Sequence, residues 1–210
     1  MTHTNHRQGT RESLNKDYVV FMYGAKGINT KEIGHKLQEF VRLAQKHDPV
    51  NIGSPRLGNM YTSSADRIMA GLTTETKAYA VFDDRESAAA LIKETKKADF
   101  GISIIVSGLF DEVKEIYRAA GGQPHTAQCS LGVWGKTEKL PEPEIQQITT
   151  MCGHAMVSTN LVRRMAFDIQ AGKISVAKAA IVLAKPCVCG VFNPKRAEEL
   201  LQQYIANAIS

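Results

Sequence analysis

The spacing of apolar residues along the chain changes near residue 135. Before that point, short continuous apolar runs typical of buried strands alternate with longer stretches that carry one apolar face at helical spacing. The pattern predicts strands at 18–23, 77–82, 101–106 and 125–134, and helices at 29–47, 85–97 and 109–120. The first of these helices should begin at Asn29, because Glu32 three residues later completes a capping box. Residues 48–76 are expected to form a long irregular connection that holds one short helix at 64–71.

This alternation of strands and helices indicates an α/β domain over residues 17–135. We expect an open sheet with crossover helices, and a ferredoxin-like split βαβ arrangement is equally compatible, because sequence defines strands better than their pairing. After residue 136 only helical spacing remains, with helices predicted at 141–151, 155–171 and 175–185 and one from Asn193 onward. A small helical domain at 136–210, which bears cysteines and a histidine, therefore follows the sheet. Residues 1–16 are polar without apolar periodicity and are expected to form a mobile arm.

Composition places the chain among folded proteins. With 210 residues and 43% hydrophobic residues it can bury a substantial core. No apolar run approaches the roughly 18 to 20 residues that a membrane span needs, and the polar start lacks the apolar centre of a secretory signal. We therefore expect a soluble, cytoplasmic protein that does not bind membranes.

The net positive charge does not indicate nucleic-acid binding. The 26 Lys and Arg residues exceed the 21 Asp and Glu residues, but the excess is split between the two ends of the chain and is zero over residues 17–120. A nucleic-acid domain usually concentrates basic residues on one stripe and interleaves aromatic residues, which make up only 7% of this chain. Nucleic acid is thus not an expected partner, whereas self-association into a homo-oligomer stays open.

The cysteines are the first clue to chemistry. All four, Cys129, Cys152, Cys187 and Cys189, lie in the last 82 residues. Without a secretory signal they are too few for a disulfide framework, so reduced thiols are expected. The helices at 155–171 and 175–185 should pack as an antiparallel hairpin, which would return the segment after residue 186 toward Cys152 and His154.

Three thiols and an imidazole on irregular backbone beside glycines predict a metal centre for redox or Lewis-acid chemistry. The expected ligands are Cys152, Cys187 and Cys189, with Cys129 or His154 as the additional donor. An iron-sulfur cluster is slightly favoured over zinc, because the set is rich in thiols and contains no Cys-x-x-Cys pair. The alternative is a binding or scaffold module whose cysteines are only packed in the interior.

A second alternative is a thiol enzyme without a cofactor. Met151-Cys152-Gly153-His154 resembles the tetrapeptide with which proline racemases and related epimerases hold one of two catalytic thiols at a helix start. The resemblance implies a catalytic Cys152 and a second thiol from Cys187 or Cys189. It covers four residues, and the rest of the chain resembles that family in neither length nor strand pattern. No family is assigned, and whether the chain is an enzyme stays open.

Two glycine-containing loops are candidate sites for a small anionic ligand or cofactor. Each follows a predicted strand and precedes a predicted helix, where ligands bind in open α/β sheets. Neither is a Walker loop or a dinucleotide fingerprint, and in the other interpretation the glycines only form turns. The candidate residues are Gly24, Lys26, Gly27, Asn29, Thr30, Ser107 and Gly108.

Overall fold

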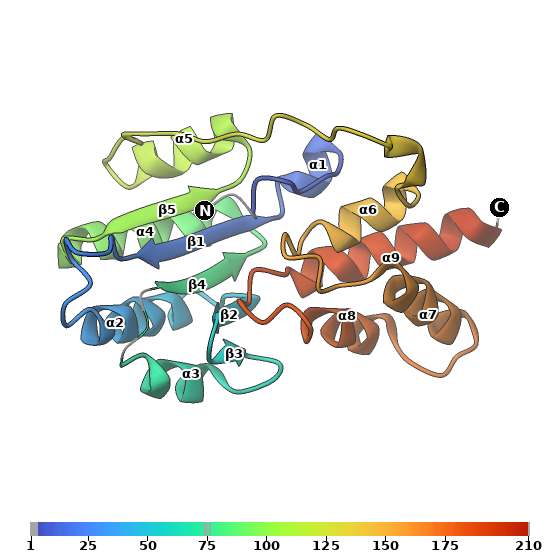
Figure 1. Cartoon of the computed structure of the whole chain (residues 1–210), viewed down its shortest axis with the longest axis horizontal. Coiled ribbons are helices and arrows are strands. Elements are labelled where there is room, and N and C mark those ends of the chain that lie inside the picture. Colours follow the sequence, from blue (N-terminus) through green and yellow to red (C-terminus); the bar gives the residue numbers. More distant parts are fainter. Residues whose placement is uncertain (1–3, 74, 76, 210) are drawn as a thin grey trace.

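The computed structural model describes residues 4–73, 75 and 77–209 and has a mixed α/β architecture (Figure 1). Its described residues form a five-stranded open sheet in the order β3-β2-β4-β1-β5, in which every paired strand is antiparallel to its neighbour. The strands are β1 (Tyr18–Tyr23), β2 (Asn51–Ser54), β3 (Gly58–Asn59), β4 (Lys77–Phe82) and β5 (Ser103–Ser107). The coarse α/β class expected from the sequence is therefore confirmed.

Two crossover connections build the sheet. The helix α2 (Gly34–Gln45) leads from β1 to β2, and α4 (Arg85–Ala98) leads from β4 to β5. Because β4 is antiparallel to both β1 and β2, the strands β1 and β2 run in the same direction with β4 between them. By the same argument β4 and β5 are parallel to each other with β1 between them.

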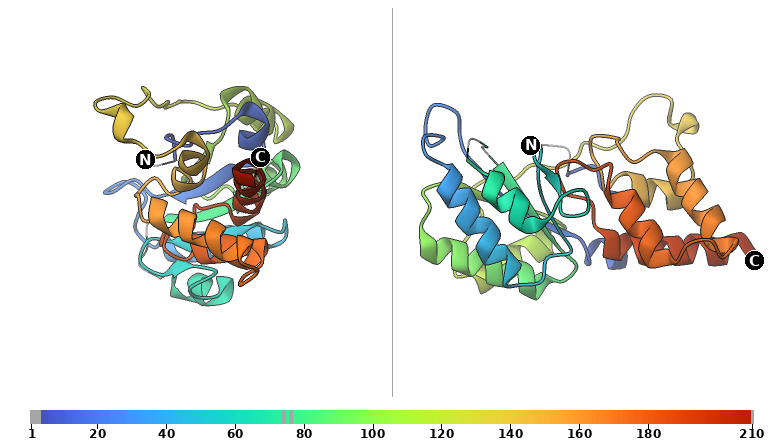
Figure 2. Two further views of the ribbon diagram at one scale, coloured as in Figure 1. Left: turned by 90° about the vertical axis from the view of Figure 1, so that its right-hand side faces the viewer. Right: turned by 90° about the horizontal axis from the view of Figure 1, so that it is seen from below.

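The remaining helices fall into two groups (Figure 2). One group lies with the sheet and the other gathers at the opposite end of the molecule. The first comprises α3 (Ala65–Gly71) and α5 (Phe110–Ala119), with the short α1 (Arg11–Leu14) near the N-terminus. The second comprises α6 (Pro143–Thr149), α7 (Thr159–Gln170), α8 (Val176–Ala184) and α9 (Pro194–Ile209), preceded by a 3-10 turn at Thr137–Lys139. No helix of the described residues is both long and apolar enough to cross a membrane.

The sheet separates two apolar cores. Alternate residues of β1 point to opposite faces, so Val20 and Met22 pack with α2, α3, α4 and α5. Val19 and Phe21 instead join a cluster that contains residues of α6, α7, α8 and α9. The C-terminal helices thus share a core with the sheet, and this core crosses the boundary drawn at residue 135 from the sequence.

Three local expectations were wrong, each for an identifiable reason. The helix expected from Asn29 begins at Gly34, because the Asn29 side chain holds the preceding loop: Oδ1 accepts from Ala25 N and Nδ2 donates to Gly101 O. The strand expected at 125–134 is not formed, since the segment pairs with no strand and a strand needs a partner. The connection at 48–76 holds, besides α3, the two short strands β2 and β3.

The N-terminal segment is docked against the protein, whereas the sequence suggested a mobile arm. The side chain of Arg7 is 6% exposed and forms an ion pair with Asp17, which is fully buried. Arg196 from α9 is also buried, and its Nη1 lies 2.8 Å from Asp17 Oδ2. Because Arg196 also donates to Ser13 Oγ and Gln8 O, residues 7–17 are tied to the C-terminal helix.

Candidate functional site

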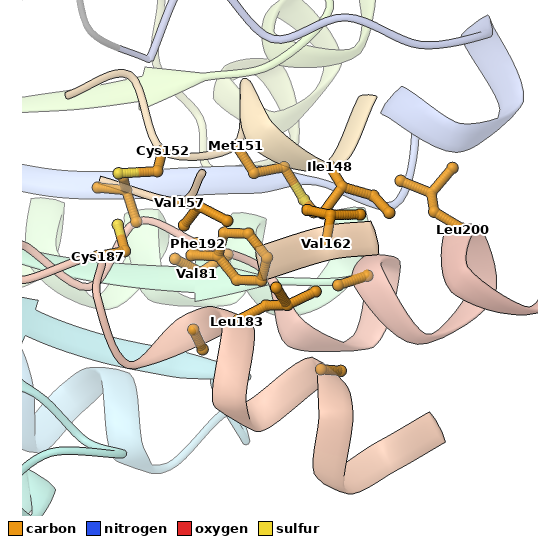
Figure 3. Close-up of a cluster of buried hydrophobic side chains, with 14 of the residues drawn as sticks. Val81, Ile148, Met151, Cys152, Val157, Val162, Leu183, Cys187, Phe192 and Leu200 are labelled. Atoms are coloured by element: carbon orange, nitrogen blue, oxygen red, sulfur yellow. The ribbon is translucent and has the colours of Figure 1, made fainter. Parts of the chain in front are cut away.

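Three cysteines from two irregular segments belong to one apolar core. Figure 3 shows two of them, Cys152 and Cys187, side by side. Cys152 follows α6, and Cys187 and Cys189 lie in the turn between α8 and α9. Their exposed fractions are 2%, 0% and 1%. Cys187 Sγ lies 3.9 Å from Cys189 Sγ, and a side-chain hydrogen bond joins Cys152 and Cys187. The structure thus brings together the three thiols that the helical hairpin was expected to bring together.

Of the two residues considered as a fourth donor, His154 lies at this cluster. Its Nδ1 is 3.7 Å from Cys189 Sγ, and the imidazole is at the surface while the three thiols are buried. Cys129 is exposed in the segment after α5 and lines a separate pocket with His125. The cluster therefore consists of two pairs with one intervening residue each, Cys152-x-His154 and Cys187-x-Cys189.

The edge of the sheet holds the turn that carries Cys187 and Cys189. Asn59 Nδ2 donates to the carbonyl oxygens of Ala184, Lys185 and Cys187 at 3.2, 3.1 and 2.9 Å. The side-chain amide of Asn59 thus binds carbonyl oxygens at the end of α8 and at the start of the turn. Asn51 Nδ2 donates to Phe192 O at 2.8 Å on the other side of the turn.

Two glycines allow the turn to touch the sheet directly. A Cβ built on Gly53 of β2 would lie 2.5 Å from Cys189 O. A Cβ on Gly190 would lie 2.6 Å from the Cα of Gly53, and Gly190 also has φ +76°. Only glycine fits at both positions, because the backbones are in contact there. No sequence signal assigned Asn51, Gly53 or Asn59 to the site, since they lie more than 90 residues before Cys152.

The position of Cys152 differs from the one that its tetrapeptide suggested. α7 begins at Thr159 and is capped by Ser158, whereas Cys152 follows the carboxyl end of α6. A helix N-terminus that would stabilise a Cys152 thiolate is therefore not adjacent in the chain. The hydrogen bond with Cys187, followed by burial, raises the pKa of Cys152 far above its usual range. A buried thiol held neutral in this way is a poor nucleophile, so the geometry does not favour Cys152 as a catalytic thiol.

Hydrogen bonds set the electrostatics of the other two thiols. The hydrogen bond with Cys152 lowers the pKa of Cys187, but the hydrogen bond to Cys189 and burial outweigh it and raise the value to about 12. The hydrogen bond from Cys187 lowers the pKa of Cys189 against the effect of burial. Next to them, burial and then the charge of Cys189 raise the pKa of Tyr79.

Backbone N–H groups converge on all three sulfur atoms. Hydrogen bonds from the backbone of Met156 and His154 act on Cys152, and the backbone of Val191 acts on both Cys187 and Cys189. Each of these hydrogen bonds lowers the pKa of its thiol. These donors favour the thiolate, although the hydrogen bonds between the thiols and burial outweigh them at Cys152 and Cys187.

Arg7 joins the two cysteine-bearing segments from outside. Its Nη2 donates to Met151 O at 3.3 Å and also to Val191 O, so one guanidinium contacts a residue next to Cys152 and a residue of the Cys187–Phe192 segment. This contact crosses more than 140 residues of sequence. The sequence offered no signal for it, because Arg7 lies in a polar stretch without a periodic pattern.

The two glycine loops do not come together. Since β1 and β5 are antiparallel, with Tyr23 opposite Ser103 and Val19 opposite Ser107, their carboxyl ends lie at opposite ends of the sheet. Ser107 and Gly108 line the pocket that contains Cys129, whereas Gly24, Lys26, Gly27, Asn29 and Thr30 belong to the loop at the other end. A single anion site that uses both loops, as a parallel sheet would form, is therefore not present.

Within the described part of the chain, no three or more His, Cys, Asp or Glu side chains are arranged as a ready-made site for a metal ion. The thiols of the cluster hydrogen-bond to one another instead. Comparison of the chain with models of known protein families, with curated proteins and with solved structures gives no match.

Proposed function

We propose that the cysteine cluster binds one metal ion through Cys152, Cys187, Cys189 and His154, and that the ion is zinc. The observation that carries this proposal is the convergence of three buried thiols and one imidazole on two irregular segments whose backbone N–H groups donate to the sulfur atoms. Neutral packed thiols do not need such donors, whereas thiolate ligands are stabilised by them. Metal binding would replace the hydrogen bonds between the thiols and would release their protons.

The spacing of the sulfur atoms favours a single zinc ion over a cubane iron-sulfur cluster. Two thiolates that bind one zinc ion at about 2.3 Å with a tetrahedral angle lie about 3.8 Å apart. Cys187 Sγ and Cys189 Sγ are separated by 3.9 Å. In a cubane iron-sulfur cluster each thiolate binds a different iron, so the ligand sulfurs must lie farther apart.

Four protein ligands would leave the ion no open position, which is typical of structural zinc. Bound there, zinc would hold the Cys152 segment, the Cys187 turn and through Asn59 the edge of the sheet in one arrangement. His154 is the exposed donor, so Lewis-acid chemistry would require its replacement by a substrate atom. The structural role is the one that the burial of the thiols supports.

We also infer that the sheet is a variant of the ferredoxin-like split βαβ arrangement. Its support is the order β2-β4-β1-β5, in which each of two parallel strand pairs encloses one antiparallel strand. The short strand β3 extends this arrangement at the edge next to the cysteine turn.

Metal analysis of the purified protein tests the zinc proposal. The protein is purified anaerobically, its visible spectrum is recorded, and iron, sulfide and zinc are measured per chain. We expect a colourless protein with one zinc per chain, lost in each of Cys152→Ser, Cys187→Ser and Cys189→Ser. Cys129→Ser is the matched control and should retain the metal, because Cys129 lies outside the cluster. Absence of stoichiometric metal after anaerobic reconstitution with zinc would refute the proposal.

A cofactor-free thiol site at Cys189 is the second candidate. The contact of 3.7 Å between Cys189 Sγ and His154 Nδ1 favours it, because an imidazole next to a thiol can take up its proton. In that case a protein free of metal should be alkylated by iodoacetamide faster at Cys189 than at Cys129, although Cys129 is more exposed. Slower alkylation of Cys189 together with stoichiometric zinc would exclude this candidate.

A further inference from the structure

A pocket of about 440 Å³ is lined in part by Arg7, which also contacts the two cysteine-bearing segments. Its other walls are the N-terminal segment, β5, α5 and residues 124–130 of the irregular segment that follows α5. Its volume falls in the range of about 300 to 1,000 Å³ that is typical of small-molecule sites. The pocket contains none of the residues proposed to bind metal, so it is a separate site.

The walls of the pocket are mainly apolar. Phe21, Ile105, Leu109, Val113 and Tyr117 contribute to the lining. These side chains come from β1, β5 and α5 and from Leu109 at the start of α5, and a regular scaffold of this kind holds a pocket open better than loops do. An apolar tail or ring of a ligand is therefore the group that these walls would take up.

Arg7 places a positive charge at the wall of the pocket. The Arg7 side chain lines the pocket and is 6% exposed, so it is nine-tenths buried. Its Nη1 lies against Asp17 and its Nη2 donates to two backbone carbonyls, but its Nε has no hydrogen-bond partner among the described residues. A buried N–H of a cation without an acceptor is costly, so the positive charge of Arg7 is incompletely compensated by its surroundings.

Asp17 compensates only part of the positive charge around it. Its Oδ1 already contacts Arg7 Nη1 and Asn193 Nδ2, and its Oδ2 accepts from Arg196 Nη1. Two buried guanidinium groups share this one carboxylate, so the three side chains keep one excess positive charge. Lys114 also lines the pocket. The excess positive charge and Lys114 favour a negatively charged ligand group.

We propose that this pocket binds a small carboxylate that carries an apolar tail. The carboxylate is attracted by the excess positive charge of Arg7, Arg196 and Asp17 and by Lys114, and the tail packs against the apolar wall formed by β5 and α5. This ligand class goes beyond the zinc site, and its binding does not depend on metal content. Because Arg7 also contacts Met151 O and Val191 O, an occupied pocket adjoins the residues that carry the cysteine cluster.

Isothermal titration with octanoate and with 1-octanol tests the proposal, because the two probes share one apolar chain and differ in charge. We expect octanoate to bind at least tenfold more tightly than 1-octanol, because only the anion is attracted by the positive charge at the pocket wall. Ala127→Trp should abolish binding of both probes, since Ala127 lines the pocket in an exposed segment and the larger side chain fills it. Ala70→Trp on the exposed face of α3 is the matched control and should bind octanoate like the parent.

Arg7→Gln separates the role of the charge from that of the walls. We expect this variant to bind octanoate and 1-octanol with equal affinity, because only the anion uses the guanidinium. Should the variant not fold, the comparison of Ala127→Trp with Ala70→Trp still decides the question. Equal affinity of the parent for both probes, lack of binding, or undiminished binding by Ala127→Trp would overturn the proposal.

Discussion

The contact between the cysteine turn and the sheet leads to a sharp prediction at Gly190. We expect Gly190→Ala to destabilise the protein much more than Gly172→Ala. Both glycines have a positive φ, +76° at Gly190 and +67° at Gly172. They differ in their surroundings, because a Cβ at Gly172 would meet open space whereas a Cβ at Gly190 would lie 2.6 Å from Gly53 Cα.

The two substitutions share one energetic cost and differ in another. An alanine in the left-handed region costs about 1 to 2 kcal/mol, which applies to both positions. Forcing a methyl group into a packed backbone contact adds about 1 to 3 kcal/mol, which applies only to Gly190. The expected losses of unfolding free energy are therefore about 1 to 2 kcal/mol for Gly172→Ala and about 2 to 5 kcal/mol for Gly190→Ala.

Urea unfolding followed by far-UV circular dichroism measures both losses. The parent and the two variants are compared in the same reducing buffer with a chelator, so that differences in metal content do not contribute. Equal destabilisation of the two variants within about 0.5 kcal/mol would refute the reasoning, because the close approach of turn and sheet would then carry no energy.

Three more predictions follow from the contacts of the site. Asn59→Ala should cost about 1 to 3 kcal/mol of unfolding free energy, because buried carbonyl oxygens lose their donor. Asn160→Ala, at an exposed position, is the control and should be close to neutral in urea unfolding. Asp17→Asn should cost about 3 to 5 kcal/mol by leaving two buried guanidinium groups without a charge partner, while Asp111→Asn in an exposed ion pair should unfold like the parent. In the folded protein iodoacetamide should modify Cys129 first, with the three buried thiols reacting only after denaturation, as counted by mass spectrometry; early labelling of a buried thiol would contradict the burial described.

Local sequence patterns determined most of the regular elements. The continuous apolar runs at 18–23 and 77–82 predicted β1 and β4 to the residue. Ser175 and Asn193 marked the starts of α8 and α9, since their side chains accept from backbone N–H groups of the first turn. Such signals are readable because propensity, apolar spacing and capping act over a few residues.

These local signals did not predict which distant segments pair as strands. The residues of β2 show no alternating pattern and form a strand because β4 supplies a partner along one edge. The segment 125–134 has the composition of a strand but finds no partner. Strand formation therefore depends on hydrogen bonds that only the assembled sheet provides.

The same distinction between local signals and distant contacts applies to the cysteine site. Its ligand types and the return of the Cys187 turn toward Cys152 followed from the sequence, because a short connection between two helices makes them antiparallel. The contacts of Asn59, Gly53 and Arg7 with the cysteine segments did not follow from the sequence. The sequence also did not show that His154, and not Cys129, lies next to the thiols. These contacts join segments up to 184 residues apart, and they form only once both cores have packed, so tertiary structure alone decides them.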